Sequence, residues 1–386
     1  MTAQVENASP TSTGLALRAR ERFERALADF PWEVRVEDWT GQAYRLGGQR
    51  EHWTGEPLIV RLRTPAAAAA IVNWRPMAFL EGVLRGDADL EGNLYLMPHV
   101  RAHTGFDLRG RDIPGIVARH LPFQSIRRAR ANVKQHYDIP QAALDTYLDH
   151  RYRAYSCAWF EDPTRLDREE LLRPGEGRTD DWDSLEKAQW RKFQNAVDFV
   201  DPRPGERMLD IGCGYGGQLE VALESTDIGQ VVGWTHSSNQ VEGARAALAG
   251  FDPARWEVRE GDYRLDDDVY DHVTSTGMVS HVGPRGLEPY VRNVRRRIRR
   301  GGAYVHHALM RVHLDTPFEL QIGTAFHKRF VWPGYHWFTL GQHMRALERG
   351  GFEVQAEINL TRHYAKTGAA WYERMMQHAD EVEALM

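Results

Sequence analysis

The segment LDIGCGYGG, at residues 209–217, has the residue types of a ligand-binding turn. Apolar residues flank Asp210, and Gly212, Gly214 and Gly216 follow closely. Glycine lacks a Cβ, so it adopts positive φ and lets a ligand approach the main chain. A helix that begins just beyond such a turn offers free N–H groups to a carboxylate or a phosphate. The pattern therefore predicts a buried strand, a glycine turn and a helix that together bind a ligand.

The spacing of these glycines differs from that of dinucleotide-binding loops. Those loops follow G-x-G-x-x-G and place an acid about twenty residues further on. Here the order is G-x-G-x-G-G, and the next predicted strand ends in Trp234 and Thr235 rather than in an acid. The segment EGDYR at residues 260–264 also favours a nucleotide-like ligand. We expect such a ligand, with a purely structural turn as the alternative.

The composition limits the function classes. The chain has 386 residues, 42% of them hydrophobic, which is enough for one large domain and a smaller one. A formal net charge of −5 argues against nucleic acid as a partner. Its two cysteines, Cys157 and Cys213, are far apart, which excludes a disulfide framework or a zinc cluster and fits a reducing cytoplasm. We identify no signal peptide and no apolar run of bilayer length, and we expect no metal.

The N-terminal part predicts a tail and a small α+β domain. Residues 1–13 are polar, and we expect a disordered tail there. An amphipathic helix is predicted for residues 15–30, followed by short strands and helices between glycine and proline turns. This domain, residues 14–121, has no paired acids, no metal spacing and no nucleophile motif. Its default role is structural, or the delivery of substrate.

Residues 122–386 predict a second domain of α/β type. It begins with a basic connector at residues 126–134, interpreted as a solvated helix face or as a patch for anionic lipid. Predicted strands then alternate with helices, which requires a mostly parallel sheet with helices on both faces. The predicted strands that follow the glycine turn cover residues 231–235, 256–262, 272–277, 303–310 and 352–360.

Six motifs in this order resemble the cyclopropane-fatty-acyl-phospholipid synthases and the mycolic acid methyltransferases. The motifs are HYDI (136–139), YSCAWF (155–160), LDIGCGYGG (209–217), EGDYR (260–264), GMVSHVGP (277–284) and HYAKTGAAWYE (363–373). The resemblance implies a class I methyltransferase fold, Rossmann-like, with S-adenosylmethionine as cofactor. The first domain resembles the N-terminal lipid-handling module of the bacterial enzymes through GDADLEGNL at residues 86–94.

The resemblance implies methyl transfer to the cis double bond of an acyl chain in a membrane phospholipid. An alkene is a poor nucleophile, so the sulfonium methyl group must be held in line with it. The resulting carbocation needs an apolar tunnel that excludes water, and aromatic faces stabilise it. For each aromatic residue, simple core packing is the alternative. The expected tunnel residues are Tyr155, Trp159, Phe160 and Trp371.

The resemblance also carries cofactor contacts over, motif by motif. The glycines are expected to hold the methionine part, the segment after the second strand the ribose, and EGDYR the adenine. For Thr235 and Ser237, N-capping of the next helix is the alternative. The expected cofactor residues are Tyr137, Ser156, Asp210, Gly212, Gly214, Gly216, Thr235, Ser237, Gln240, Asp262 and Tyr263.

The proton-accepting site is where this sequence departs from the family. The family uses bicarbonate, held by a cysteine, a glutamate, a histidine with a backbone group, and a tyrosine. The glutamate position is Ser280, which is shorter and uncharged. His306 and His307 alternate on a strand and point to opposite faces, and we assign the site to His307. The expected catalytic residues are Cys157, Ser280, His281, His307 with the backbone of Leu309, and Tyr364.

These observations leave several outcomes open. In the first outcome, bicarbonate binds with altered affinity and a cyclopropane forms. In the second, which we favour, the base has moved and the product is a methyl- or methylene-branched chain. A lipid- or cofactor-binding protein without turnover is the alternative of another class, and a small-molecule methyltransferase is a further one. We expect a cytoplasmic protein, peripheral on the inner face of the membrane, and a homodimer. The run at residues 291–300, rich in arginine, is a membrane-facing patch or a solvated helix end.

Overall fold

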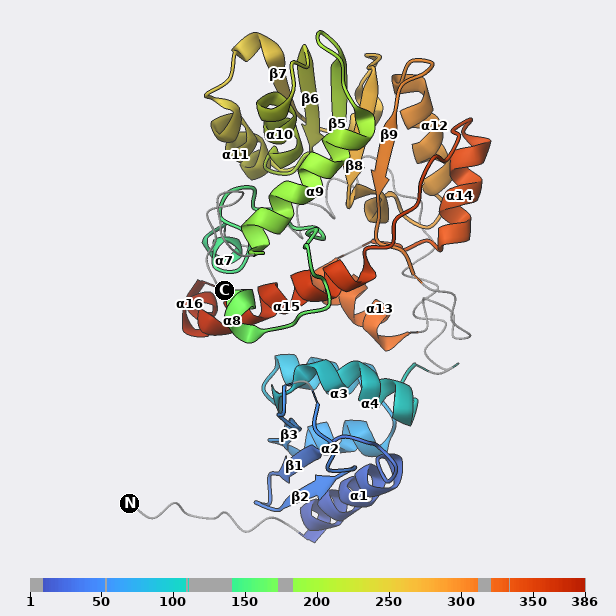
Figure 1. Cartoon of the computed structure of the whole chain (residues 1–386). Coiled ribbons are helices and arrows are strands. Elements are labelled where there is room, and N and C mark those ends of the chain that lie inside the picture. The colour runs from blue at the N-terminus through green and yellow to red at the C-terminus, as the bar shows by residue number, and fades with distance from the viewer. Residues whose placement is uncertain are drawn as a thin grey trace. The chain divides into compact units, whose positions relative to one another are not determined.

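The computed structural model describes residues 10–52, 54–108, 110, 141–172, 183–311, 321–332 and 334–385. The chain divides into two compact units, shown in Figure 1. The first comprises Met1–Leu121 and Leu314–Val331, and the second comprises Pro122–His313 and Trp332–Met386. Residues 314–331, which the sequence analysis assigned to the second domain, thus belong to the first unit.

The first unit is a small α+β fold. It contains the helices α1 (Pro10–Ala26), α2 (Pro65–Val72), α3 (Pro76–Leu84), α4 (Met97–Thr104) and α13 (Ile322–Phe326) and the strands β1 (Val34–Asp38), β2 (Ala43–Leu46), β3 (Leu58–Leu62) and β4 (Ala88–Gly92). Helix α1 already begins at Pro10, inside the stretch expected to be a tail. It buries Ala19 in the core of the unit.

The sheet of the first unit has the order β2-β1-β3-β4. Strand β1 pairs parallel with β3 and antiparallel with β2, and β3 pairs antiparallel with β4. Alternate residues are buried, such as Val34 and Val36 on β1, because successive side chains of a strand point to opposite faces. Helix α13 is fixed to this unit by the backbone N–H of Ile322, which donates to Asp107, and the π-helical turn that follows it (His327–Val331) by an ion pair of Arg329 with Glu81.

The second unit is the larger α/β fold. It contains the helices α7 (Gln141–Asp145), α8 (Arg168–Leu172), α9 (Leu185–Val200), α10 (Gly217–Ser225), α11 (Ser238–Leu248), α12 (Leu287–Arg297), α14 (Leu340–Arg349), α15 (Thr361–Gln377) and α16 (Ala379–Leu385). Its strands are β5 (Arg207–Ile211), β6 (Gln230–Thr235), β7 (Trp256–Glu260), β8 (His272–Thr276) and β9 (Tyr304–His307).

The five strands pair in parallel in the order β7-β6-β5-β8-β9. Met208 of β5 belongs to a core with α9, α10 and α11, and its neighbour Leu209 belongs to a second core with α12 and α14. Helices therefore cover both faces of the sheet, as Figure 1 shows and as the sequence predicted. The strand order reverses at β5, which places the ligand site at the carboxyl ends of β5 and β8.

One predicted strand is not formed. Residues 352–360 contain no strand, and Val354 and Ile358 are exposed. The alternation of apolar and polar residues suggested a half-buried strand, but residues 353–359 are all exposed and, among the described residues of this segment, only Phe352 packs against the core. In the described part of the chain, β9 is accordingly the last strand on its side of the sheet. Among the described helices, none is long and apolar enough to cross a bilayer.

Candidate active site

The glycine turn follows directly after β5 and opens onto a cavity. Gly212, Gly214 and Gly216 have φ of 82°, 54° and 87°, in the left-handed region. The N–H groups of Gly212 and Cys213 donate to the carbonyl of Trp234, which folds the turn against β6. A Cβ on Gly212 would lie 2.9 Å from the Cβ of Met278, so the fold requires glycine at this position.

The cavity of the second unit has a volume of about 1870 Å³. It extends from the glycine turn past the ends of β6 and β8 and along the free edge of β9. A smaller cavity adjoins the turn and reaches Asp210. Most residues expected from the sequence line the larger cavity: Tyr155, Ser156, Cys157, Trp159, Gly212, Gly214, Thr235, Gln240, Asp262, Tyr263, Ser280, His281, His307, Leu309 and Tyr364.

The residues expected at the ribose bond mainly to each other. The hydroxyl of Thr235 donates to Oε1 of Gln240 over 2.5 Å. Ser237 is the N-cap of α11, where its hydroxyl accepts from the N–H of Gln240, and it does not line either cavity. Ser237 therefore caps a helix, which is the alternative that the sequence left open, while Thr235 and Gln240 line the cavity. Gly216 is likewise placed outside both cavities, as the N-cap of α10.

The residues expected at the adenine have partners that the sequence analysis did not foresee. Arg264 donates to Asp262 from Nε and Nη2 of its guanidinium, at 2.7 and 2.5 Å, and His236 lies 3.3 Å from the same carboxylate. Although burial raises it, these hydrogen bonds hold the pKa of Asp262 below its usual range. Asp262 is therefore an ionised acceptor, buried beside Tyr263. Tyr137 lies outside the described residues.

A buried lysine stands behind Ser156. Lys192 on α9 donates from Nζ to Oγ of Ser156 and to Oε1 of Gln189, both over 2.7 Å. Gln189 in turn donates to the carbonyls of Ala154 and Ser156. Burial lowers the pKa of Lys192 to about 8, although nearby acids oppose this. Burial also raises the pKa of Asp210 to about 7, against a hydrogen bond from Thr274 and the charge of Lys192.

The reaction-site cluster, which we define as Cys157, Ser280, His307 and Tyr364, lines the cavity, and Gly277 joins two of its members. The N–H of Gly277 donates to the carbonyl of His307, and the hydroxyl of Ser280 donates to the carbonyl of Gly277 over 3.1 Å. A Cβ on Gly277 would lie 3.8 Å from Ser156. Burial raises the pKa of Cys157 to about 12, so this thiol stays protonated.

The two histidines of β9 point to opposite faces. His306 bonds to Tyr304 at 2.8 Å and to His343 at 2.9 Å, on the side of α14. His307 lies within reach of the charge of Lys192, and both histidines line the cavity. Burial lowers the pKa of His307 to about 4, and its Nδ1 has no hydrogen-bond partner among the described residues. Burial also lowers the pKa of His281 to about 4, so both rings are neutral near pH 7.

Aromatic rings surround this cluster. Tyr155 stacks on Trp371 with ring centroids 5.1 Å apart, and Tyr364 meets Trp371 edge-on at 6.1 Å. Trp332, which the sequence analysis missed, packs against Tyr155 at 6.2 Å. Trp371 and Phe160 do not line the cavity. Trp371 supports the rings that do, so packing describes it better than contact with a ligand.

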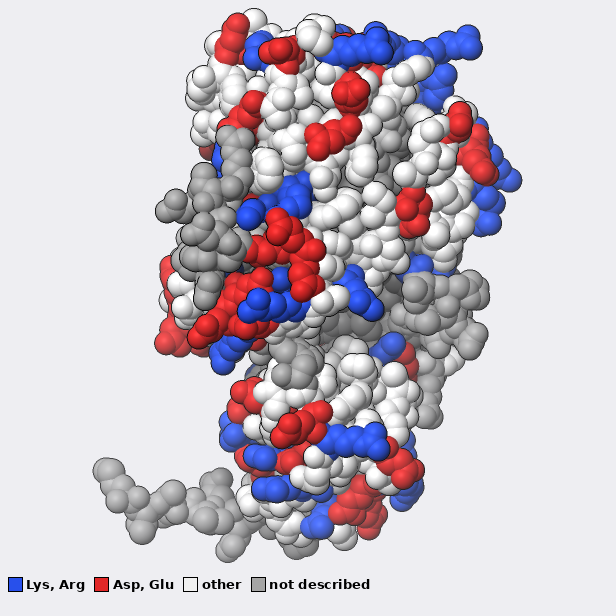
Figure 2. Space-filling model, viewed as in Figure 1, with Lys and Arg blue, Asp and Glu red and all other residues white. Residues whose placement is uncertain are grey.

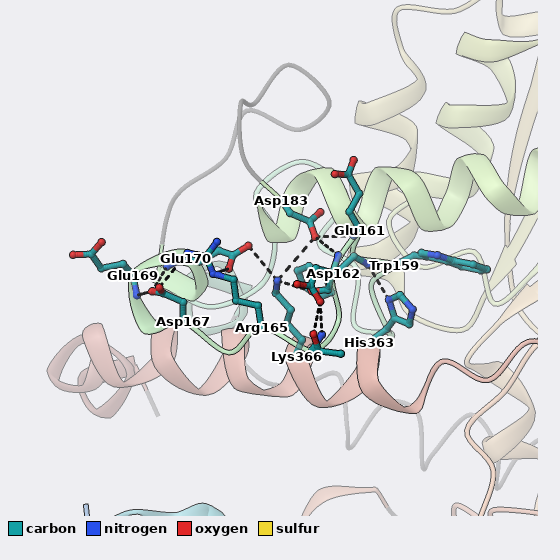
Figure 3. A network of polar contacts seen from close by, with 12 residues as sticks. Trp159, Glu161, Asp162, Arg165, Asp167, Glu169, Glu170, Asp183, His363 and Lys366 are labelled. Atoms are coloured by element: carbon teal, nitrogen blue, oxygen red, sulfur yellow. Dashed lines mark hydrogen bonds and ion pairs between the residues drawn. The ribbon is translucent and has the colours of Figure 1, made fainter. Parts of the chain in front are cut away.

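The motifs YSCAWF and HYAKTGAAWYE form one structural assembly (Figure 3). The hydroxyl of Thr367 accepts from the N–H of Ala158 at 3.0 Å, and Nδ1 of His363 accepts from the N–H of Phe160 at 3.1 Å. These bonds run along the first turns of α15, which also carries Tyr364. The segment of Cys157 and the helix of Tyr364 are thereby locked side by side.

Lys366 on α15 joins the same helix to the segment that follows Phe160. It is fully buried over the ring of Phe160, and its Nζ donates to the carbonyl of Asp162 at 3.0 Å and to Glu170 at 3.2 Å. Figure 3 shows Lys366 among Asp162, Glu170 and Asp183. The acidic segment that carries Asp162 and Glu170 is therefore anchored to α15 where it is described.

The basic run at residues 291–300 lies where α12 ends and before β9 begins. Figure 2 shows Lys and Arg gathered at that edge of the second unit. Several of these guanidinium groups have partners, such as Arg299 with Glu206 and with Asp271. The glycine turn follows the opposite ends of the strands. The basic connector at residues 126–134 lies outside the described residues.

The site suits a nucleoside with a carboxylate-bearing tail. The glycine turn presents main chain to the cavity, Ser156 offers a hydroxyl, and ionised Asp262 offers an acceptor at the far side. Within the described residues, His, Cys, Asp and Glu form no cluster suited to a metal ion.

Comparisons with known proteins identify the family of this chain. A family model described as Mycolic acid cyclopropane synthetase matches residues 124–386. Cyclopropane-fatty-acyl-phospholipid synthase of Escherichia coli K12 is 29% identical over 265 residues, or 69% of this chain and 62% of that protein. Probable fatty acid methyltransferase Rv3720 of Mycobacterium tuberculosis is 30% identical over 272 residues, or 69% and 57%. The chain spans less than two thirds of the length of these relatives.

A solved structure shares the fold of the second unit. The cyclopropane synthase MmaA2 from Mycobacterium tuberculosis has a TM-score of 0.58 and 25% sequence identity, covering 67% of this chain and 86% of that one. The class I methyltransferase fold that the motifs predicted is thereby confirmed.

Proposed function

We propose, from the premise that the chain belongs to the mycolic acid cyclopropane synthetase family, that it is an S-adenosylmethionine-dependent methyltransferase of fatty acyl chains. Its substrate is an unsaturated acyl chain of a phospholipid, reached at the membrane surface. Relatives with names of this kind, including a cyclopropane-fatty-acyl-phospholipid synthase, support the assignment.

One observation carries the proposal: aromatic rings and a buried neutral histidine share a cavity with the glycine turn. The cofactor supplies an electrophilic methyl group. Tyr155, Trp159 and Tyr364 exclude water and stabilise positive charge on the methylated acyl chain through their ring faces. An open polar basin without such rings would not protect a carbocation.

His307 is the residue that handles the proton. Its neutral ring has a free Nδ1 in the described part of the molecule, so it can accept a proton from the methylated chain or hold an ion that does so. Cys157 stays protonated, and its thiol donates to the carbonyl of Ala158. We propose that Lys192 and Ser156 complete the polar side of this site.

We propose further that the product is methyl- or methylene-branched. Ser280 is 5% exposed, and its hydroxyl donates to the carbonyl of Gly277. It therefore does not orient a protonated partner as a carboxylate would. Weaker control over the base lets the cation shift before it loses a proton. The second candidate is a cyclopropane synthase that still uses bicarbonate. The observation that supports it is that Cys157, His307 and Tyr364 line the same cavity.

Mass spectrometry of lipid tests both candidates. Vesicles of dioleoyl phosphatidylglycerol and dioleoyl phosphatidylethanolamine are incubated with the chain and with cofactor whose methyl group carries three deuterium atoms. A methylated alkene keeps all of the label, whereas a ring or a methylene group loses one deuterium. Mild hydrogenation then separates the methylene group, which takes up two hydrogens, from the ring. No label in lipid, with the cofactor bound, would replace the proposal with a non-catalytic binder.

A further inference from the structure

Lys192 is a buried cation without an anionic partner in the described part of the chain. It is 5% exposed, and no described carboxylate lies within 4.0 Å of its Nζ. Its contacts are the neutral oxygens of Ser156 and Gln189 and the ring of Phe193, whose centroid is 4.0 Å away. Burying a charge is costly unless an opposite charge compensates it.

The nearest acids are already engaged elsewhere. Asp149 accepts from the N–H groups of Tyr152 and Ala154 at 2.7 and 2.8 Å. Asp210 accepts from the hydroxyl of Thr274 at 2.9 Å. Both influence Lys192 electrostatically, but neither forms an ion pair with it. The position therefore lacks a direct anionic partner from these residues.

The bond to Lys192 fixes what Ser156 can do. An ammonium group has only donors, so the Ser156 oxygen must be the acceptor in this bond. The hydroxyl proton of Ser156 is then left for another acceptor. The Ser156 hydroxyl has no further hydrogen-bond partner among the described residues, and Ser156 lines the cavity beside the glycine turn. Its hydroxyl is thus a donor available to a ligand.

We propose that Lys192 and Ser156 form an anion-binding dyad: Ser156 donates to a carboxylate-type anion in the cavity, and Lys192 supplies the compensating positive charge. Lys192 is a positioning residue, because it acts through Ser156 and does not itself line the cavity. This inference rests on the proposed function, which offers two such anions. One is the carboxylate of the cofactor's methionine part, and the other is bicarbonate.

Calorimetry separates the two sources without any turnover. S-adenosylhomocysteine carries the carboxylate, and methylthioadenosine is a similar nucleoside thioether that lacks the whole amino-acid tail, both its carboxylate and its ammonium group. If the cofactor's carboxylate is the ligand, Lys192→Met weakens S-adenosylhomocysteine binding about tenfold and leaves methylthioadenosine binding unchanged. If bicarbonate is the ligand, both nucleosides bind as before, and bicarbonate titrated into the S-adenosylhomocysteine complex binds about tenfold more weakly.

Two further variants guard against a trivial loss of structure. Ser156→Ala removes only the hydroxyl and is expected to weaken binding of the anion as much as Lys192→Met does. The double variant, with both substitutions, is expected to bind the anion no more weakly than either single variant. Lys187→Met, a half-buried lysine on the same helix, is the matched control with unchanged binding. Equal weakening of both nucleosides, or no change for any of the three ligands, would overturn the dyad. A wild-type chain that prefers S-adenosylhomocysteine but labels no lipid would overturn only the proposed function.

Discussion

At the scale of single residues, Lys192 gives the site a pH dependence. Its pKa is lowered to about 8 by burial, so its charge is present at neutral pH and is lost as the pH rises above about 8. Since an anion prefers the charged form, the affinity for S-adenosylhomocysteine relative to methylthioadenosine is expected to fall between about pH 7.5 and 9. Calorimetry at several pH values measures this ratio.

The other titratable groups that face Lys192 do not produce this slope. His307 stays neutral throughout, since its pKa is about 4, Cys157 stays protonated with a pKa of about 12, and Asp210 titrates near 7. Asp149 also faces Lys192. Lys192→Met keeps all of these groups, so its ratio is expected to be flat over the same range. The same slope in both proteins would contradict the assignment to Lys192.

Ser280 gives a second prediction for a single residue. Ser280→Glu restores the carboxylate that the family carries near His307, and we expect a shift from branched product toward cyclopropane because the base is again oriented. Gas chromatography of fatty acid methyl esters, coupled to mass spectrometry, measures the product ratio. Ser280→Ala, which adds no carboxylate, is expected to keep the branched product. An unchanged ratio in Ser280→Glu would remove Ser280 from the explanation.

The sequence predicted the residues that motifs mark and missed those that motifs do not. Gly212 and His307 stand in recognisable patterns, and both face the cavity. Lys192 gave a weaker signal: it stands with Gln189 on the helix face that buries Ala188 and Phe193. A lysine on an apolar face is rare without a partner, and this signal alone could have found it. The partners of Asp262 depend on side-chain directions that spacing does not fix.

At the scale of elements, α15 positions Tyr364 through contacts with the segment after Cys157. Lys366→Met removes the cation that joins Glu170 and the carbonyl of Asp162. Removing one partner of a buried ion pair costs about 3 kcal/mol, so we expect a melting temperature lower by about 6–12 °C. Differential scanning calorimetry measures this.

The same variant is expected to lower methyl transfer more than cofactor binding, because α15 carries Tyr364 and not the glycine turn. Arg362→Met, at an exposed position of the same helix, is the matched control with little effect on either. A Lys366→Met protein as stable as the wild type would show that the buried contacts in Figure 3 do not hold the helix in place.

Hydrophobic periodicity predicted most of the second unit's elements. The strands β5 to β9 fall where apolar runs end in glycine or polar turns, because a parallel sheet buries both of its faces. Residues 352–360 have a strand-like pattern but form no described strand, since strand pairing depends on another segment and not on the pattern itself. The assignment of residues 314–331 to the first unit could not be predicted for a similar reason, because no local feature of the sequence indicates with which unit a connecting segment packs.

At the scale of the whole molecule, the two units are interleaved in sequence. The chain leaves the second unit after β9, contributes α13 and the π-helical turn His327–Val331 to the first unit, and returns before α14. The second unit carries the cavity and the sequence motifs that line it. In sequence, residues 314–331 of the first unit separate its two parts. The effect of a substitution at residues 1–121 on the first unit can therefore be measured by hydrogen exchange in α13, far away in the sequence.

Asp107 tests this membership directly. One carboxylate oxygen accepts from the N–H of Ile322, and the other lies 2.8 Å from Arg101. Asp107→Ala removes the acceptor, so amide exchange in α13 and the following turn is expected to accelerate about tenfold, for a loss of about 1.4 kcal/mol. Hydrogen exchange with mass spectrometry resolves these peptides from those of β5 to β9, which are expected to keep their protection. Asp107→Asn retains an acceptor oxygen for Ile322 and is expected to exchange more slowly than Asp107→Ala. If instead the sheet of the second unit lost protection while α13 did not, the segment would belong with the methyltransferase fold.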